Sequence, residues 1–212
     1  MAEYTIELRS RILNGIINLR VLMPEAPSLT IQSPKEYYGS GKKLKVLWLL
    51  HPAAGGGGDW VRCTNLARYT ENREVMVVLP SAFNSDYANY PVFADGYRFY
   101  DFFLEELMPY IYGWFPASAK PEDNFIAGAS MGGNGAMEIG FSNPELFGGI
   151  GILSCAARYI EYLRPYRNMT SEEFRREGTD KNRFPGTYPE GFNRKEINMI
   201  AKYRTVGDFL DS

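Results

Sequence analysis

One serine of this chain lies in a context that can turn its hydroxyl into a nucleophile. Ser130 is the centre of Gly128-Ala129-Ser130-Met131-Gly132, a Gly-x-Ser-x-Gly motif. The motif follows a short apolar run, 124–129, that predicts a buried strand, and it leads into residues 131–143, which predict a helix. A serine on a sharp turn from strand to helix is exposed and can attack a carbonyl carbon. We therefore take Ser130 as the candidate nucleophile.

The spacing of the glycines follows from the geometry of such a turn. The turn crowds the residues two positions before and after the serine, so we expect Gly128 and Gly132 where a Cβ would clash. The helix that begins after the serine directs free N–H groups and its dipole toward a developing oxyanion, and Met131 N–H is one natural donor. A Gly-x-Ser-x-Gly motif also occurs by chance, and its glycines can simply let a helix pack closely on a strand.

Composition sets limits on the class of protein. With 212 residues and 45% hydrophobic residues, we expect one domain, 1–212, with a substantial core. A net charge of -2 and a pI near 5.6 give no reason to expect nucleic acid or a membrane surface as a partner. The N-terminus lacks the basic start and apolar block of a signal peptide. We expect a cytoplasmic protein whose two cysteines, Cys63 and Cys155, are reduced.

Apolar runs alternate with helical patterns along the chain. The expected strands cover residues 44–50, 75–79, 124–129 and 148–154. The expected helices cover residues 60–69, 99–115 and 131–143. This alternation indicates an α/β fold with a mainly parallel sheet and helices on both faces. Two alternating runs, 4–8 and 17–21, flank Asn14-Gly15 and predict an N-terminal antiparallel hairpin with a tight turn.

The candidate site forms where strands end. Ligands in parallel sheets bind at the carboxyl ends of the strands. The loop from His51 to Trp60 follows one expected strand and Ser130 follows another, so we expect them to meet. Residues 158–193 are polar and aromatic, and we interpret them as an excursion over the active-site face. Gly39-Ser40-Gly41-Lys42 is no phosphate loop, because the Walker spacing is absent and no strand precedes it.

Four separated segments together resemble, in order, the esterase branch of the α/β-hydrolases, which includes esterase D and the tributyrin, acetyl and feruloyl esterases. The segments are Leu49-Leu50-His51 with a Gly-rich loop and Trp60; Val77-Val78-Leu79-Pro80-Ser81 with Asn84-Ser85 and Tyr87; Glu105-Glu106-Leu107 before Phe115-Pro116; and Phe125 to Gly133. The likeness covers roughly Glu3 to Ala157. It implies an α/β-hydrolase three-layer sandwich that hydrolyses small-molecule esters with short acyl groups through an acyl-enzyme on Ser130.

The resemblance also implies an oxyanion hole built from backbone N–H groups. One donor is Met131, and the other belongs to the His51 loop, where the family's donor maps to Ala53. The family usually has Gly after this His, whereas this chain has Pro52, which cannot donate an N–H. The choice between Ala53 and Ala54 therefore stays open.

The general base has no obvious candidate in the sequence. In this fold the triad follows the order Ser, then Asp or Glu, then His, but the only histidine is His51, which precedes the serine. The first explanation is that the chain is truncated and lacks the C-terminal strands with the triad histidine. A second is that His51 or a partner chain supplies the base. A third is a non-catalytic relative that binds esters or another protein. Acyl transfer to an acceptor other than water is a further alternative.

Several aspartates are candidates for the acid of a catalytic triad. Asp180, Asp208 and Asp211 are the candidate acids within the chain, but each is better explained as a solvated surface charge, because without a downstream histidine none has a ring to orient. We expect Asp59, beside Trp60, to cap the following helix. One histidine and two distant cysteines make no ligand set, so neither a metal nor another cofactor is expected. Missing C-terminal strands would leave an unpaired sheet edge and an apolar face, which favour a homo-oligomer.

Overall fold

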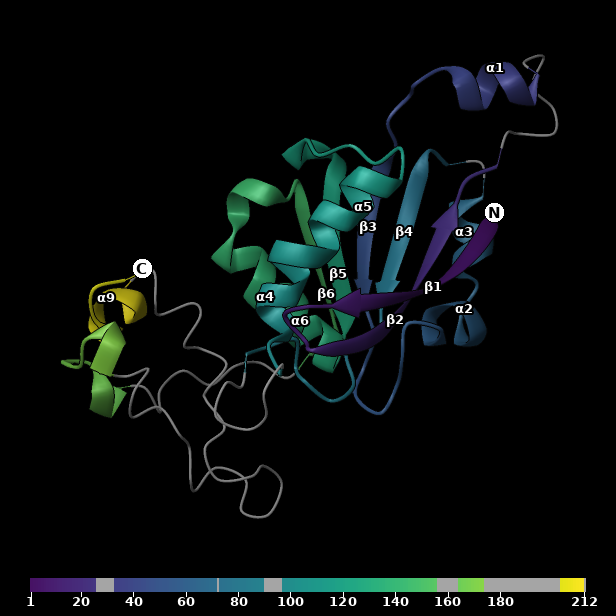
Figure 1. The fold of residues 1–212 in the computed structure, drawn as a ribbon. Coiled ribbons are helices and arrows are strands. Elements are labelled where there is room, and N and C mark those ends of the chain that lie inside the picture. Colours follow the sequence, from purple (N-terminus) through teal and green to yellow (C-terminus); the bar gives the residue numbers. More distant parts are fainter. Residues whose placement is uncertain (26–32, 72, 90–96, 156–163, 174–202, 212) are drawn as a thin grey trace.

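The computed structural model describes residues 1–25, 33–71, 73–89, 97–155, 164–173 and 203–211 (Figure 1). Its strands are β1 Ala2–Ser10, β2 Gly15–Met23, β3 Lys45–Leu50, β4 Val75–Pro80, β5 Asn124–Ala129 and β6 Gly149–Leu153. Its α-helices are α1 Pro34–Gly39, α2 Asp59–Cys63, α3 Leu66–Thr70, α4 Phe99–Asp101, α5 Met108–Trp114, α6 Met131–Ser142 and α9 Val206–Leu210. A π-helix, η1 Phe102–Leu107, joins α4 to α5, and the 3-10 turns are η2 Pro121–Asp123 and η3 Pro144–Leu146.

Within these ranges the strands form one mixed sheet in the order β1-β2-β4-β3-β5-β6. β4, β3, β5 and β6 run parallel, whereas β1 and β2 form an antiparallel hairpin that joins the sheet through antiparallel pairing of β2 with β4. The predicted mainly parallel sheet with an N-terminal hairpin is confirmed. Because β3, β4, β5 and β6 run in the same direction, their carboxyl ends lie along one edge, at the bottom of Figure 1.

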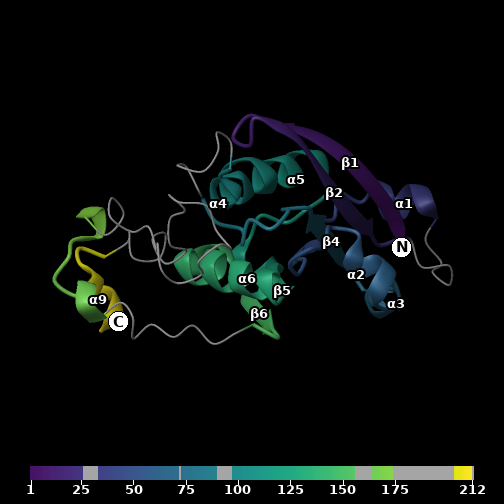
Figure 2. The same ribbon diagram turned by 90° about the horizontal axis from the view of Figure 1, so that it is seen from below.

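The two faces of the sheet bury alternate residues of each central strand. In β3, Trp48 and Leu50 belong to the larger core, which also holds side chains of η1, α5 and α6, and the Trp48 and Phe103 rings pack edge to face 5.3 Å apart. Leu49 faces the other way, against a smaller core that includes Trp60 and Leu66 of α2 and α3. Figure 2 shows α5 and the α2–α3 pair on opposite sides of the sheet. A strand covered on both faces reads as a continuous apolar run.

A buried amide fixes the start of β5. Asn124 is fully buried and accepts hydrogen bonds at Oδ1 from Trp48 Nε1 at 3.0 Å and from the Tyr112 hydroxyl at 2.9 Å. Its Nδ2 donates to the Ser118 and Lys120 carbonyls, both at 2.9 Å. Burial raises the pKa of Tyr112 to about 12, so its hydroxyl stays protonated at neutral pH and acts as the donor in this hydrogen bond. A fully satisfied buried amide makes the position of the strand specific.

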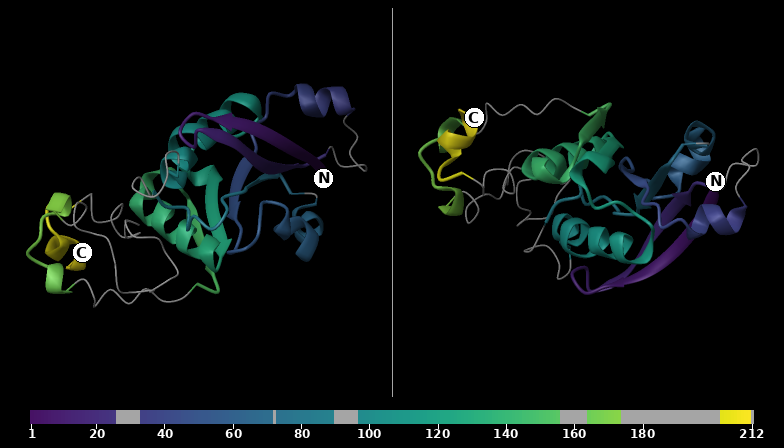
Figure 3. Two further views of the ribbon diagram at one scale, coloured as in Figure 1. Left: turned by 60° about the horizontal axis from the view of Figure 1, so that its bottom comes forward. Right: turned by 90° about the horizontal axis from the view of Figure 1, so that it is seen from above.

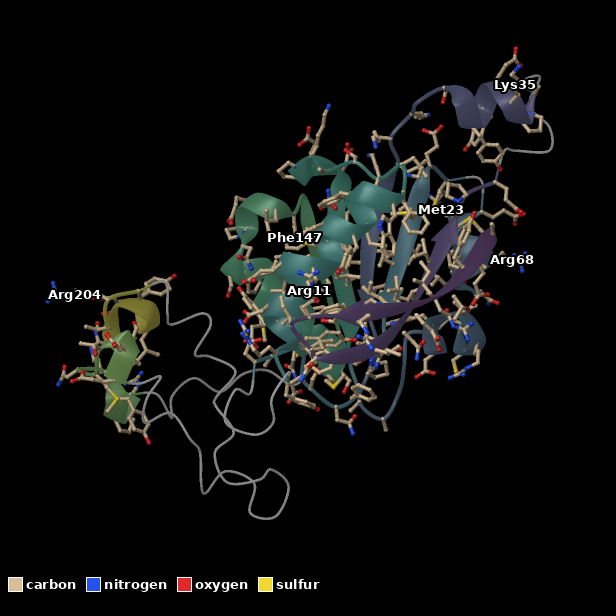
Figure 4. The ribbon with its side chains drawn as sticks, viewed as in Figure 1. Arg11, Met23, Lys35, Arg68, Phe147 and Arg204 are labelled. Carbon is tan, nitrogen blue, oxygen red and sulfur yellow. The ribbon has the colours of Figure 1, made fainter. Side chains whose placement is uncertain are left out.

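The hairpin differs from the predicted tight turn. Its last pair is Ser10 with Gly15, so four residues form the loop, and Asn14 adopts a positive φ of 50°. Glu106 of η1 accepts hydrogen bonds from the Ser10 hydroxyl and from the Arg11 N–H, the latter at 2.9 Å. Figure 3 shows the hairpin lying along the helical layer, and Figure 4 labels Arg11 at its turn. The loop is therefore held both by η1 and by its own Ser10 hydroxyl, which accepts the Leu13 N–H at 2.8 Å.

Other differences are local. Helix α1 was not predicted from the sequence. It begins at a capping box in which Ser33 and Glu36 bond each other's backbone N–H groups. The predicted excursion 158–193 lies mostly outside the described residues and stays a prediction. In the described part, Val206 N–H donates to the Met169 carbonyl at 3.0 Å. This small unit, with α9, lies away from the sheet in Figures 1 and 3.

Candidate active site

Ser130 is held in a strained backbone conformation between β5 and α6. Its φ of 53° and ψ of -116° are unusual for a residue with a side chain, and such a conformation costs about 1–3 kcal/mol. The Ser130 N–H donates to the Leu153 carbonyl at the end of β6 at 2.9 Å, and its carbonyl accepts Asn134 N–H at 3.0 Å. Ser130 is exposed. Neighbouring backbone thus holds the residue on a turn that presents its hydroxyl to solvent.

The two glycines of the motif occupy places where no side chain fits. A Cβ on Gly128 would lie 2.2 Å from the Gly132 carbonyl oxygen, and a Cβ on Gly132 would lie 2.3 Å from the Leu50 carbonyl oxygen. Both distances are far below van der Waals contact. The second also shows that the first turn of α6 lies directly against the end of β3. The structure therefore brings Ser130 and the His51 loop to the same place, as the sequence predicted.

The loop after β3 begins with a turn whose amides point in different directions. The Gly55 N–H donates to the Pro52 carbonyl at 3.3 Å, which closes a turn with Ala53 and Ala54 at its centre, and Ala54 has a φ of 59°. The Ala54 N–H donates to Asn84 Oδ1 at 2.7 Å. Among the described residues, Ala53 N–H has no hydrogen-bond partner. The Ala54 N–H is therefore already bonded, which leaves the Ala53 N–H as the candidate donor of the two.

Met131 is the first residue of α6, so its N–H belongs to the first turn, whose amides have no partner within the helix. The Met131 residue is buried, with 4% of its surface exposed. The helix dipole adds partial positive charge at this end. Met131 and Ala53 are thus two backbone donors on the elements that flank Ser130, and the chemistry they suit is stabilisation of an oxyanion.

His51 is a buried ring with both nitrogens in use. Nδ1 donates to the Pro52 carbonyl at 2.7 Å, and Nε2 accepts the Ala82 N–H at 2.9 Å. Burial lowers the pKa of His51, although the Pro52 carbonyl and the charge of Asp59 act in the opposite direction. The ring is therefore neutral near pH 7 and joins the loops that follow β3 and β4. In this arrangement it has no lone pair for the Ser130 proton.

Tyr87 supports the same loop. From the sequence it was one of the residues that carry the family resemblance, with no structural role predicted for it. Its hydroxyl accepts the His51 N–H at 2.8 Å, and the side chain is fully buried, which raises its pKa well above the ordinary value. A Cβ on Gly135 of α6 would lie 2.6 Å from the Tyr87 ring. Tyr87 thus connects the His51 backbone with the helix that follows Ser130. The sequence signal for this is the Gly at 135, which a helix interior otherwise disfavours.

Comparison with known proteins identifies the family. The family model described as "Putative esterase" matches residues 22–182. The chain belongs to this esterase family. An acetyl esterase from Caldicellulosiruptor saccharolyticus is 31% identical over 207 residues, which cover 95% of this chain and 73% of that protein. The likeness therefore extends well beyond the serine motif.

Solved structures agree with the family and the fold. An S-formylglutathione hydrolase from Staphylococcus aureus superposes with a TM-score of 0.63 and 31% identity over 77% of this chain and 61% of that one. The S. aureus fluorophosphonate-binding serine hydrolase FphF has a TM-score of 0.58 and 32% identity over 69% of this chain and 54% of its own. The α/β-hydrolase fold is confirmed. The chain spans between half and two thirds of these two neighbours.

The carboxylates of this esterase-family chain have structural partners. Asp59 is not the helix cap that the sequence predicted: Gly58 is the N-cap of α2, and Asp59 instead accepts the Gly56 N–H at 3.0 Å and pairs with Arg62. The Gly56 hydrogen bond is the main cause of its lowered pKa. The Asp59 carboxylate therefore accepts an N–H group of the preceding loop, that of Gly56, rather than one from the first turn of α2.

The candidate acids lie outside the site where the structure describes them. Asp211 pairs with Arg167, and Asp208 accepts Thr205 N–H at 3.0 Å, both in the small unit away from the sheet. Asp180 falls outside the described residues. Among the described residues no cluster of three or more His, Cys, Asp or Glu side chains could hold a metal ion. No helix in the described ranges is long and apolar enough to cross a membrane.

Proposed function

We propose that this chain is a carboxylic ester hydrolase in which Ser130 takes up short acyl groups from small-molecule esters. The observation that carries the proposal is the strained, exposed Ser130 at the start of α6. Strain of this kind persists only where the surrounding structure enforces it, and it is concentrated at functional sites. The acetyl esterase that is 31% identical supports a short acyl group. The cytoplasmic location expected from the sequence stays a prediction.

The proposed reaction has two balanced steps. Ser130 Oγ bonds to the ester carbonyl carbon, the carbonyl electron pair moves to oxygen, and a general base passes the serine proton to the departing alkoxide. The alcohol leaves, and the acyl group stays on Ser130. Water then attacks this acyl-enzyme by the same route, which releases the carboxylic acid and restores the hydroxyl. The N–H groups of Ala53 and Met131 stabilise the oxyanion in both steps.

The general base is the part of this mechanism that the described residues do not supply. His51 is the sole histidine of the chain, and both ring nitrogens are bonded to backbone groups. To act as a base, the ring would have to give up the Ala82 N–H and turn within a buried site. We therefore take the base to lie outside the described residues. Without one, the rate of a serine hydrolase typically falls on the order of 10⁴- to 10⁶-fold, so turnover by this chain alone is expected to be slow.

The test compares the chain with two serine variants. Ser154 is a matched control, because it is also exposed, has a positive φ of 47° and follows the neighbouring strand β6. We expect the chain and Ser154→Ala to hydrolyse p-nitrophenyl acetate and butyrate above background and to become labelled by a fluorophosphonate on Ser130. Ser130→Ala should do neither. Equal rates for the chain and Ser130→Ala would reject ester hydrolysis by this chain.

The alternatives from the same site are distinguished by the same samples. Acyl transfer to an acceptor other than water would give a new ester when an alcohol is added, in place of the free acid. A non-catalytic relative would bind an ester without consuming it. The observation that favours this second alternative is that both ring nitrogens of His51 are already bonded to backbone groups. Calorimetric binding of an ester to a chain that does not turn it over would establish it.

A further inference from the structure

The loop that follows β4 holds the turn at 52–55 by hydrogen bonds at two points, one through the His51 ring and one directly. At the start of the turn, His51 Nδ1 donates to the turn's first carbonyl at 2.7 Å, while Nε2 accepts the Ala82 N–H at 2.9 Å. At its third residue, the Ala54 N–H donates to Asn84 Oδ1 at 2.7 Å. Ala82, acting through the His51 ring, and Asn84, acting directly, therefore hold two consecutive peptide groups of the turn at 52–55.

These two peptide groups are the ones on either side of Ala53. The Pro52 carbonyl and the Ala53 N–H share one planar trans peptide, so the bond from His51 to that carbonyl fixes the direction of the N–H. The next peptide carries the Ala54 N–H, which Asn84 holds. Both peptide planes that orient Ala53 are thus set by side chains outside the turn.

The hydrogen bond from the Ala54 N–H to Asn84 holds a backbone conformation that alanine disfavours. Ala54 has a φ of 59°, a conformation that is costly for any residue with a Cβ. A turn of this kind can relax by rotation of its central peptide, which returns the third residue to a negative φ. The Asn84 oxygen faces the Ala54 N–H and opposes that rotation. Removing the acceptor would leave a strained turn free to relax.

We infer that Asn84 is a positioning residue of the oxyanion hole: its side-chain carbonyl anchors the Ala53–Ala54 peptide in the left-handed form of the turn, and it thereby helps to keep Ala53, whose own N–H lies in the peptide held by His51, in place beside Ser130. This inference rests on the proposed function, because it concerns the stabilisation of an oxyanion on an ester. Asn84 touches no reacting atom. Its effect passes through the peptide between Ala53 and Ala54.

A matched control is present in the same connection between β4 and α4. Asn89 also uses its Oδ1 to hold a backbone N–H, that of Asp101, at 3.2 Å, but this bond lies at the last residue of α4 and not at the turn. Asn89 Nδ2 donates in addition to Asp101 Oδ1 at 2.7 Å. Asn89→Ala therefore removes the same kind of bond from the same connection. A second variant tests the cause: glycine adopts a positive φ without strain, so Ala54→Gly should restore part of what Asn84→Ala loses.

The first experiment measures ester hydrolysis by Asn84→Ala, Asn89→Ala and the double variant Asn84→Ala with Ala54→Gly. We expect Asn84→Ala to lower kcat about 10- to 100-fold with KM within about threefold, because a misplaced oxyanion donor acts on the transition state. Asn89→Ala should keep kcat within about twofold, and the double variant should recover part of the loss. An unchanged kcat in Asn84→Ala, or an equal loss in Asn89→Ala, would overturn the inference.

A second experiment does not need turnover. Hydrogen exchange of the Ala54 amide, measured by NMR, should become about tenfold faster or more in Asn84→Ala and stay unchanged in Asn89→Ala, because only the first loses the acceptor. An unchanged Ala54 exchange rate would overturn the inference whatever the activity. Failure of the proposed function has a different signature, namely a wild-type chain that hydrolyses esters no faster than Ser130→Ala.

Discussion

At the scale of single residues, His51 shows how a histidine can be structural in a hydrolase. Its side chain is fully buried, and the hydrogen bond from the Ala82 N–H requires a lone pair on Nε2. Only the neutral ring meets that requirement. Burial lowers the pKa of His51 in the same sense. Protonation would therefore break the bond that joins the two loops beside Ser130.

This arrangement predicts a loss of stability in mild acid. The pKa of His51 is lower in the folded chain than the ordinary value of about 6.5, so the unfolded chain takes up the proton first. The stabilisation is complete above that ordinary value and is lost progressively as the pH falls through the lower, folded value. We expect the free energy of unfolding, measured with urea, to decrease as the pH falls below about 6.5.

Substitution of His51 is a suitable control for this prediction, because the chain has no other histidine that could titrate in this pH range. His51→Gln is expected to be less stable at every pH, but its free energy of unfolding should change much less over the same range. Carboxylates contribute mainly at lower pH. If the variant keeps the slope of the wild-type chain, the pH dependence belongs to another group and the neutral-ring interpretation is wrong.

The residues of the site were predictable to different degrees. Ser130, Gly128 and Gly132 belong to a local motif, and local backbone geometry explains all three. The role inferred for Asn84 could not be found this way, because it depends on a contact across 30 positions of the chain. The choice between Ala53 and Ala54 was open for the same reason. A sequence shows which amides exist but not which are already bonded.

At the scale of elements, Glu106 joins the helical layer to the N-terminal hairpin. It lies in η1, where Met108 N–H bonds five residues back to Phe103. Pro109 follows directly, and a proline lacks an N–H and crowds the carbonyl four residues before it, which disfavours a regular α-helix here. The Glu106 carboxylate accepts two backbone N–H groups and the Ser10 hydroxyl from the hairpin turn.

We expect Glu106→Ala to destabilise the chain by about 1–3 kcal/mol, since it leaves two amides of the turn and a buried Ser10 without their acceptor. The neighbouring Glu105 is exposed, so Glu105→Ala should change stability by less than about 0.5 kcal/mol. Chemical unfolding of both variants measures the difference. Similar stabilities for the two would show that the turn holds itself and that the hydrogen bonds to Glu106 are incidental.

The same elements show what periodicity can predict. The four parallel strands were placed within about one residue at each end, because buried parallel strands are short apolar runs between turn residues. The hairpin strands β1 and β2 extend about two residues beyond the predicted runs at each end. The π-helix was not foreseen, although Pro109 marks it, because its spacing still resembles that of an α-helix. Helix α1 was missed because it has no buried side chain and therefore no apolar pattern. Its signal is the Ser33–Glu36 capping box alone.

At the scale of the whole molecule, β6 is the strand whose surroundings differ most from those of the other parallel strands. Among the described residues it pairs with β5 along one side. Ile152 and Leu153 have 41% and 47% of their surfaces exposed, and the strand carries no charged residue. Such an edge offers free backbone groups and apolar side chains to another chain. The homo-oligomer expected from the sequence stays a prediction, and this edge is where we expect it to form.

We expect the 212-residue chain to self-associate through this edge, with a mass that rises with protein concentration in sedimentation or light-scattering experiments. Ile152→Lys places a charge on the edge strand, which opposes pairing between edges, and should keep the chain monomeric at higher concentration. Tyr69→Lys is the matched control, because Tyr69 is an apolar side chain with 70% of its surface exposed on α3, away from β6. Monomers at every concentration would contradict the prediction. Equal effects of the two lysines would show that added charge, and not the β6 edge, controls association.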